Sequence, residues 1–313
     1  MENILNTRKR RVYFYVLSIT ILILFLVLRY TFFKDSTELE PKSEFVIITG
    51  KIIESLFVSL LTTVGLTFLY FNITPNDDKR TIKLVDKTYR IEKAFHKARK
   101  DADYWRFNGG IGRYTRTKTL PELYKISSKK KENIIVTLII MNPNNPKLCE
   151  NYANYKNSLD FKNNNKWTQK STRVNLFATI LKATQYENQS NFLDVNIYVK
   201  DYFSLMRTEL TQNKVIITKE DPSIPVISLE KKSYLYSPYK EDFNQTMNQS
   251  VFVEIKKDSN LNKPIEDINF EDARFFFDNI SIESPSDDEI SDILEVLQND
   301  KNPFPSSFKS LIS

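Results

Sequence analysis

The sequence predicts an N-terminal hairpin of two transmembrane helices followed by a cytoplasmic α/β domain with a mixed sheet. Two observations carry this prediction. Two long apolar stretches fill most of the first 73 residues, and a helix needs about 20 apolar residues to cross the hydrocarbon core of a bilayer. Beyond them, short runs of branched apolar residues alternate with segments in which apolar residues recur every three or four positions. That alternation is typical of strands and helices sharing one core.

The composition excludes several kinds of site. The chain of 313 residues has one cysteine, Cys149, and one histidine, His96, so it can form no intramolecular disulfide and no zinc site of the His/Cys type. Hydrolases in which each half of the fold supplies a histidine are excluded as well, whereas enzymes that use carboxylates alone remain open. The net charge of +6 suits a membrane surface or an anionic ligand, but it is too small to indicate nucleic-acid binding by itself.

The first apolar stretch, VYFYVLSITILILFLVLRYTFF at residues 12–33, predicts a retained membrane span. It has 22 residues and one charge, Arg29, near its end, from where a long basic side chain reaches the interface. A cleaved signal peptide is disfavoured. The apolar core of a signal peptide has only about 7 to 15 residues and is followed by a small-residue cleavage site, whereas this stretch is longer and no such site follows it.

The second span is expected at residues 50–73. Lys51 and Glu54 interrupt its first turns, but from residue 56 onward apolar residues occupy all sides of the helix. This favours a crossing helix over an amphipathic helix in the interface. Basic residues precede the first span and follow the second, whereas the connecting loop, KDSTELEPKSE, carries four acids and two lysines. The positive-inside rule therefore predicts that both termini are cytoplasmic.

Small polar residues on one face of the second span form a candidate association surface: Ser55, Ser59, Thr62 and Thr63. Such residues let membrane helices approach closely and form hydrogen bonds. Two interpretations stay open, namely packing against the first span and self-association of the chain into a homo-oligomer.

The chain is expected to have four parts: the hairpin at 1–76, a stalk helix at 77–106, the α/β domain at 107–283 and an acidic C-terminal tail at 284–313. The stalk is expected because apolar residues from Ile82 to Trp105 recur at helical spacing.

Local patterns predict the elements of the α/β domain. Thr119, Pro121 and Glu122 match a capping box with proline in the first turn, so a helix is expected at 120–130. NIIVTLIIM, at 133–141, is a nearly continuous apolar run typical of a buried strand. The other expected elements are helices at 147–159, 167–186, 267–279 and 290–297, and strands at 193–200, from 214, at 226–229 and at 251–255.

Six residues between the stalk and the first helix of the domain form the candidate ligand- or partner-binding site: Gly109, Gly110, Gly112, Arg113, Arg116 and Lys118. Successive glycines expose backbone N–H groups, arginines bind phosphate oxygens, and a helix start adds positive potential. The fingerprints of nucleotide-binding loops are absent, because a helix and not a strand is expected before the glycines. The structural alternative is that the glycines end the stalk helix and that 113–118 form a short edge strand.

Three asparagines follow the strand at 133–141: Asn142, Asn144 and Asn145. Ligands of α/β sheets favour the carboxyl ends of strands, so these side chains are candidates for lining the same cleft. The alternative is that they only form the turn.

The two predicted spans, followed by DADYWRFNGGIGRYTRTKTLPELYK and IIVTLIIMNPNNPKLCENYANYK, resemble the two-transmembrane effector proteins of bacterial anti-phage systems, in particular the membrane effector of one class of retron. The resemblance covers residues 1–160. A later segment, NKVIITKEDPSIPVISLEKKSYLYSPYKEDFNQ at 213–245, looks like the second portion of a phospholipase D-like domain. That family needs an H-x-K-x4-D motif, which this chain lacks, so the resemblance implies a degenerate domain that senses or scaffolds.

The resemblance implies a toxin of the bacterial inner membrane that is held silent until infection and then disrupts the lipid bilayer, so that the infected cell dies or stops growing. It implies no enzymatic activity, and no cofactor is expected. The expected regulator is a reverse transcriptase–nucleic acid complex or a nucleotide signal.

Two other classes of function remain open. One is a membrane-anchored receptor or scaffold that binds a nucleotide or nucleic acid without forming a pore. The other is a phosphodiesterase or nuclease-like enzyme that uses carboxylates such as Asp101, Asp103 and Glu122, although their spacing does not indicate a metal site.

Overall fold

The computed structural model describes residues 16–24, 26–27, 30, 44–73, 81–85, 88–159, 166–219, 224–256 and 259–300. Contacts along the chain divide it into two compact units, Met1–Asp77 and Asp78–Ser313, called unit 1 and unit 2 below.

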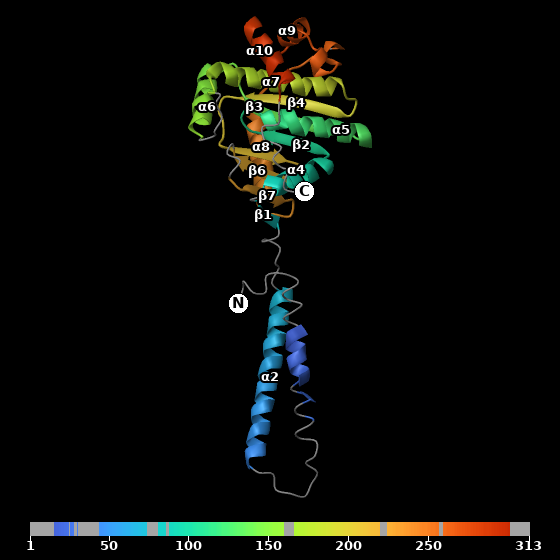
Figure 1. The fold of residues 1–313 in the computed structure, drawn as a ribbon, viewed down its shortest axis with the longest axis vertical. Helices are drawn as coiled ribbons and strands as arrows, with labels where there is room; N and C mark the ends of the chain where they lie inside the picture. The colour runs from blue at the N-terminus through green and yellow to red at the C-terminus, as the bar shows by residue number, and fades with distance from the viewer. Residues whose placement is uncertain are drawn as a thin grey trace. The chain divides into compact units, whose positions relative to one another are not determined.

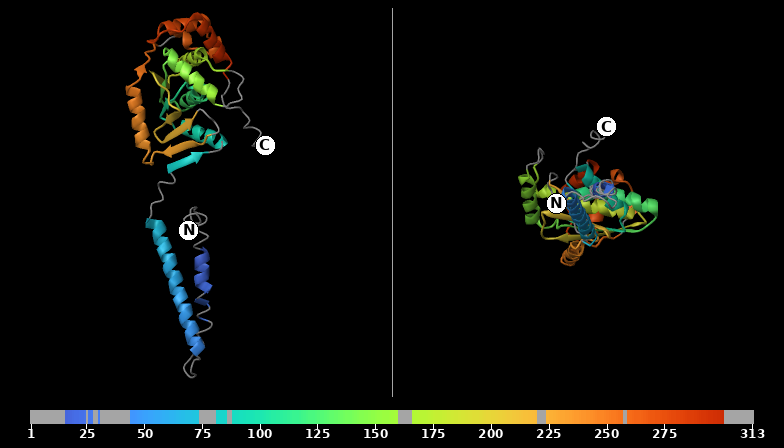
Figure 2. Two further views of the ribbon diagram at one scale, coloured as in Figure 1. Left: turned by 90° about the vertical axis from the view of Figure 1, so that its left-hand side faces the viewer. Right: turned by 90° about the horizontal axis from the view of Figure 1, so that it is seen from below.

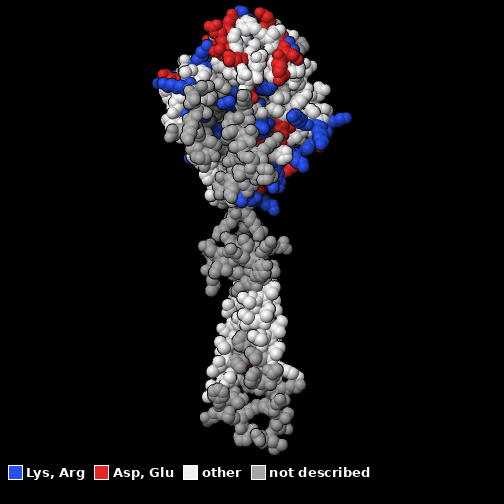
Figure 3. Space-filling view, in the orientation of Figure 1, with Lys and Arg blue, Asp and Glu red and all other residues white. Residues whose placement is uncertain are grey.

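The long helix among the described residues of unit 1 is α2 (Glu44–Ile73) (Figure 1). Its segment Ile48–Leu69 has a mean hydropathy of 1.9 and is long and apolar enough to cross a membrane. Large apolar side chains are exposed around this helix, and the described surface of unit 1 is almost free of charge in Figure 3. Of the first predicted span, residues 16–24, 26–27 and 30 are helical. The remainder lies outside the described residues, so the two-helix hairpin stays a prediction.

Unit 2 is organised by a mixed sheet, as predicted. Its described strands number eight and lie in the order β1-β7-β6-β5-β2-β3-β4-β8. β2, β3 and β4 are parallel neighbours, and all other neighbours in the sheet are antiparallel. The strands are β1 (Ile82–Val85), β2 (Tyr104–Asn108), β3 (Ile134–Met141), β4 (Leu193–Lys200), β5 (Met206–Leu210), β6 (Lys214–Lys219), β7 (Val226–Glu230) and β8 (Val251–Phe252).

Helices cover both faces of this sheet (Figure 2). The described helices of unit 2 are α4 (Thr88–Lys100), α5 (Leu120–Lys130), α6 (Pro146–Ser158), α7 (Gln169–Asn188), α8 (Tyr236–Asn248), α9 (Phe270–Asp278) and α10 (Asp287–Gln298). A π-helical turn, η1 (Thr115–Thr119), precedes α5, and the 3-10 turns η2 (Ser259–Leu261) and η3 (Ile265–Asp267) precede α9. α8 lies on one face, and the other helices lie on the opposite face.

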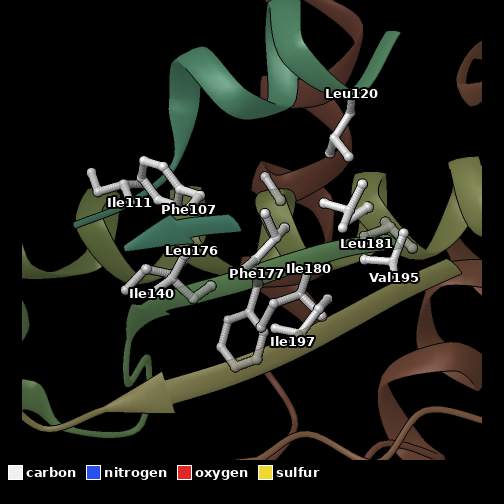
Figure 4. Packing of buried hydrophobic residues seen from close by; sticks show 14 of the residues in the cluster. Phe107, Ile111, Leu120, Ile140, Leu176, Phe177, Ile180, Leu181, Val195 and Ile197 are labelled. Carbon is white, nitrogen blue, oxygen red and sulfur yellow. The ribbon is translucent and has the colours of Figure 1, made fainter. Parts of the chain in front are cut away.

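The larger core lies between the sheet and α7. Branched residues of β3 and β4 meet the α7 side chains from Leu176 to Leu181, all of them buried (Figure 4). α7 is covered on its far side as well, where the ring of Phe177 packs edge-on against Phe277 of α9 at 5.4 Å. Burial on both sides explains why apolar residues occur all around this helix.

The smaller core lies on the other face, under α8. Leu210, Val215 and Leu229 from strands β5, β6 and β7 pack against Tyr236 and Phe243 of α8. The strands therefore alternate, with successive residues entering the two cores in turn.

The stalk-helix prediction at 77–106 is wrong. That segment contains β1, α4 and β2, and both strands are paired in the sheet. α4 does carry the expected helical period, with Phe95 and Ala98 buried. β1 and β2 have only four and five residues, too few to show the two-residue period of a strand beside the helical period of α4.

The prediction of an acidic tail outside the domain is also wrong at 284–300. α10 is one turn longer at its start than expected, and Ile290, Ile293 and Leu297 are buried in the larger core. Asp287, Asp288 and Glu295 are exposed, whereas Glu289 and Asp300 are partly buried against arginines. Acidic residues gather at the top of the surface drawn in Figure 3. Residues 301–313 of the expected tail lie outside the described residues.

Candidate functional site

The glycine-rich stretch follows strand β2 and continues its pairing with β3. The N–H group of Gly109 donates to the carbonyl of Ile139 at 3.1 Å, and the carbonyl of Gly110 accepts from Met141 at 3.2 Å. A strand and not a helix therefore precedes the glycines, contrary to expectation. The N–H group of Gly109 is therefore used by the sheet ladder and is not open to an anion.

Close packing explains why glycine occupies these positions. A Cβ atom at Gly109 would lie 2.4 Å from the ring of Phe107, and one at Gly110 would lie 2.8 Å from the ring of Tyr152. Gly112 has a φ of +78°, a conformation that favours glycine. The structural alternative thus accounts for the three glycines, although they end a strand and not a stalk helix.

The edge strand considered for 113–118 does not form. Helical turns begin at residue 113 and include η1 before running into α5. Thr119 has helical angles and makes no capping bond, so the capping-box prediction is wrong, although α5 itself spans 120–130 as predicted. The hydroxyls of Thr115 and Thr119 are buried with no hydrogen-bond partner among the described residues. Such π turns are frequent at functional sites.

Arg116 is completely buried and fully used inside unit 2. Its guanidinium donates to both carboxylate oxygens of Asp300, at 2.6 and 3.2 Å. It also donates to the carbonyl and side-chain oxygens of Asn175, at 2.8 and 3.1 Å, and to the hydroxyl of Thr179 at 3.1 Å. Burial lowers the pKa of Arg116, and the adjacent Asp300 carboxylate opposes that shift.

The other two cations of the candidate site are less enclosed. Arg113 lies 3.8 Å from the same Asp300 carboxylate, and its side chain is 41% exposed. Lys118 is half-buried. Arg113 and Arg116 thus lie close together, as the sequence suggested. Both face the carboxylate of Asp300, just beyond α10, and not an external ligand.

A second buried arginine, Arg99 of α4, was not singled out from the sequence. It pairs with Glu122 at 2.5 Å and Glu92 at 3.0 Å, and it donates to the hydroxyl of Tyr114 at 3.2 Å. His96 also contacts Glu122. Glu122, one of the carboxylates considered for catalysis, therefore holds α4 against α5.

The asparagines after β3 form the turn, which supports the structural alternative for them. The side-chain amides of Asn142 and Asn145 both donate to Asp201, at 2.9 and 3.2 Å. Asn145 also caps α6 by accepting from the N–H group of Leu148. Asn144 accepts from the guanidinium of Arg173 at 3.1 Å.

One further buried cation lies at the end of β4. Lys200 is 2% exposed, and its ammonium donates to the side-chain oxygen of Asn108 at 2.5 Å. Asn108 ends β2, on the α8 face of the sheet. The sequence carries only a weak signal for this residue. Lys200 ends strand β4, and the other residues of β4 on that face are polar or aromatic.

The candidate association face of α2 is exposed within unit 1. Ser55, Ser59, Thr62 and Thr63 all lie at the surface of the described helix. The hydroxyls of Thr62 and Thr63 donate to the carbonyls four residues earlier, each at 2.8 Å. These donors are therefore satisfied without a second helix.

No protein-family model and no curated protein matches this sequence. The site must therefore be interpreted from its own geometry.

Proposed function

We propose that this chain is a membrane-embedded effector of an anti-phage (abortive infection) system, which disrupts the bacterial inner membrane when unit 2 is activated or released. The observation that carries the proposal is the pairing of two unlike units on one chain. The Ile48–Leu69 segment is exposed, apolar and long enough to cross a bilayer, whereas unit 2 has its own buried cores. The resemblance of residues 1–160 to two-transmembrane effectors supports the anti-phage role and the disruption of the membrane.

In this proposal unit 2 receives the signal and the spans respond by rearranging or self-associating. The serine and threonine face of α2 is the proposed contact between helices, because small residues allow close approach. The proposed topology places both termini in the cytoplasm. Within unit 2, Arg113 of the candidate site has a side chain that is 41% exposed, and it is the proposed contact for a regulator.

A membrane-anchored receptor or scaffold is the second candidate, and one observation favours it. The hydroxyls of Thr62, Thr63 and Thr67 all donate to carbonyls of their own helix. A helix whose polar side chains are satisfied internally meets lipid at little cost, so it needs no partner helix and no aqueous pore.

Membrane potential in bacteria that express the full chain tests the proposal. Wild-type protein should depolarise the cells, and Leu61→Glu, which places a charge in the middle of the apolar segment, should not. Arg113→Ala is the matched change in unit 2, and it should alter the response only if this side chain contacts the regulator. An unchanged potential with well-expressed, membrane-inserted wild-type protein would contradict the effector function.

Replacing residues 1–76 by an unrelated two-helix anchor separates the two candidates. The effector should lose depolarisation on this exchange, whereas an anchored receptor should keep its ligand binding and any growth phenotype. Retained depolarisation with the foreign anchor would rule out a role of the native spans.

A further inference from the structure

Two basic residues lie on the α8 face of the sheet without a carboxylate at ion-pair distance among the described residues. Lys200 ends β4 and Arg106 lies in β2, two residues before Asn108, on the same face. Neither forms an ion pair with any described residue. An unpaired charge is costly to bury, so proteins normally supply a counter-ion for it.

The ammonium of Lys200 is only partly satisfied. It has three N–H donors, and the described residues offer it one oxygen, Oδ1 of Asn108 at 2.5 Å, together with the ring of Tyr202 at 4.5 Å. Burial lowers the pKa of Lys200 to about 8, and Asp242 of α8 acts against that shift from outside ion-pair distance. Two of the three N–H donors of Lys200 therefore have no acceptor among the described residues.

Asn108 adds donors of its own. Because lysine only donates, the side chain of Asn108 must direct its oxygen toward Lys200, which leaves its NH₂ group for another acceptor. Thr208 of β5 lies directly opposite Asn108 in the antiparallel ladder and is buried as well.

Arg106 lies on the same face of β2 as Asn108, two residues earlier, and it is half-buried. Its guanidinium packs against the rings of Tyr104 at 4.9 Å and Phe243 at 5.5 Å, and it donates to Asn244 of α8 at 3.0 Å. Arg106 and Asn244 are half-buried. Lys200, Asn108 and Arg106 therefore offer donors on one face of the sheet. Asn108 and Lys200 end the strands β2 and β4, and ligands of α/β sheets usually bind at such strand ends.

We propose that Lys200, Asn108 and Arg106 bind a small oxyanion, the phosphate or carboxylate group of a soluble ligand, between the strand ends and α8. The anion supplies the missing counter-charge for Lys200 and accepts from the amide of Asn108 and the guanidinium of Arg106. This site is separate from the glycine–arginine stretch, since Arg116 belongs to the other face of the sheet and is already used by Asp300. It lies wholly in unit 2 and does not rest on the membrane function.

Calorimetric titration of the full chain in detergent with inorganic phosphate, and separately with acetate, tests the proposal at a constant ionic strength set with sodium chloride. Wild-type protein should bind at least one of the two anions with 1:1 stoichiometry. Lys200→Met should weaken that binding by about tenfold to a hundredfold, the range expected for loss of one charge-assisted hydrogen bond. Absence of binding of either anion to folded wild-type protein would overturn the proposal.

Two further variants guard against a general loss of structure. Lys182→Met is the matched control, because Lys182 also packs on a tyrosine ring and has a pKa lowered by burial, but it lies on α7. This variant should bind as wild type does. Asn108→Asp places a carboxylate beside Lys200, so it should raise the melting temperature without anion and abolish anion binding. Wild-type affinity in both Lys200→Met and Asn108→Asp would show that the anion binds elsewhere.

Discussion

The guanidinium of Arg116 meets the carboxylate of Asp300 side by side, at 2.6 and 3.2 Å, across 184 positions of the sequence. Two parallel hydrogen bonds between these planar groups form the strongest kind of ion pair in proteins. Arg116 lies in η1 and Asp300 lies just beyond α10. The pair therefore fastens the last described helix to the turn that follows the glycines.

Breaking this pair should destabilise unit 2 strongly. Asp300→Ala leaves Arg116 charged and buried, and loss of one partner of a buried pair costs about 3–5 kcal/mol. Urea unfolding of the full chain in detergent, followed by tryptophan fluorescence, measures the change, because both tryptophans, Trp105 and Trp167, lie in unit 2. Arg116→Met combined with Asp300→Ala should be more stable than Asp300→Ala alone. Independent, additive effects of the two changes would contradict a direct pairing.

The loss of stability caused by three glycine-to-alanine substitutions should follow the space around each glycine and its φ angle. Gly110→Ala forces a shift of Tyr152 and should cost about 1–3 kcal/mol, as overpacking does. Gly112→Ala should cost about 1 kcal/mol because of its positive φ. Gly65 of α2 has no atom within 4 Å of an added Cβ, so Gly65→Ala is the control and should leave the unfolding of unit 2 unchanged. Equal stability of all three variants would contradict the packing described here.

The core position of α10 predicts a large effect from truncating one of its buried side chains. Ile293 is completely buried, so Ile293→Ala should lower the free energy of unfolding of unit 2 by about 2–5 kcal/mol. Phe275→Ala is a suitable control, because Phe275 is 53% exposed, and it should change stability by less than about 1 kcal/mol. If Ile293→Ala were as mild as the control, 284–300 would behave as the tail that the sequence suggested.

Stability should depend on pH through Lys200. Its pKa is about 8 in the folded protein, against an ordinary value of 10.5. Between these values the unfolded chain binds more protons at this position, so the free energy of unfolding rises as pH increases from about 8 to 10.5. The penalty on the folded state is complete below pH 8.

Lys200→Met should remove this dependence. In the absence of anion the variant should be more stable than wild type at pH 7 by about 1–3 kcal/mol, and the difference should shrink toward pH 10.5. The charged group that acts on Lys200 is Asp242 of α8, which the substitution leaves in place. Parallel stability curves for the two proteins across this pH range would show that Lys200 does not titrate as described.

Long, strongly patterned segments were predictable from the sequence. Strand β4 was expected at its observed bounds, β3 within one residue, and α5 at its observed bounds. The two strands are rich in branched apolar residues along their whole length, and the apolar residues of α5 recur at helical spacing. α7 was placed within two residues at each end despite its lack of a polar face.

Short or mixed segments were not predictable. β2 spans only five residues, so its alternation is lost beside the helical pattern of α4. α8 and β5 were missed, because α8 buries few side chains, among them Tyr236 and Phe243, and β5 begins with exposed residues. Pairings such as Arg116 with Asp300 and Lys200 with Asn108 join distant parts of the chain, and a single sequence carries no local signal for them.

The attachment of β1 has a mechanical consequence. β1 is the first described strand after α2 in the sequence, and it is an edge strand held to β7 by four residue pairs and by the Lys83–Glu230 pair at 3.0 Å. Any pulling force transmitted along the chain from α2 therefore reaches this ladder before it reaches either core. While β1 stays paired with β7, such a force is passed on to the sheet. Detachment of this one edge strand would absorb the force and leave the pairing of the other strands intact.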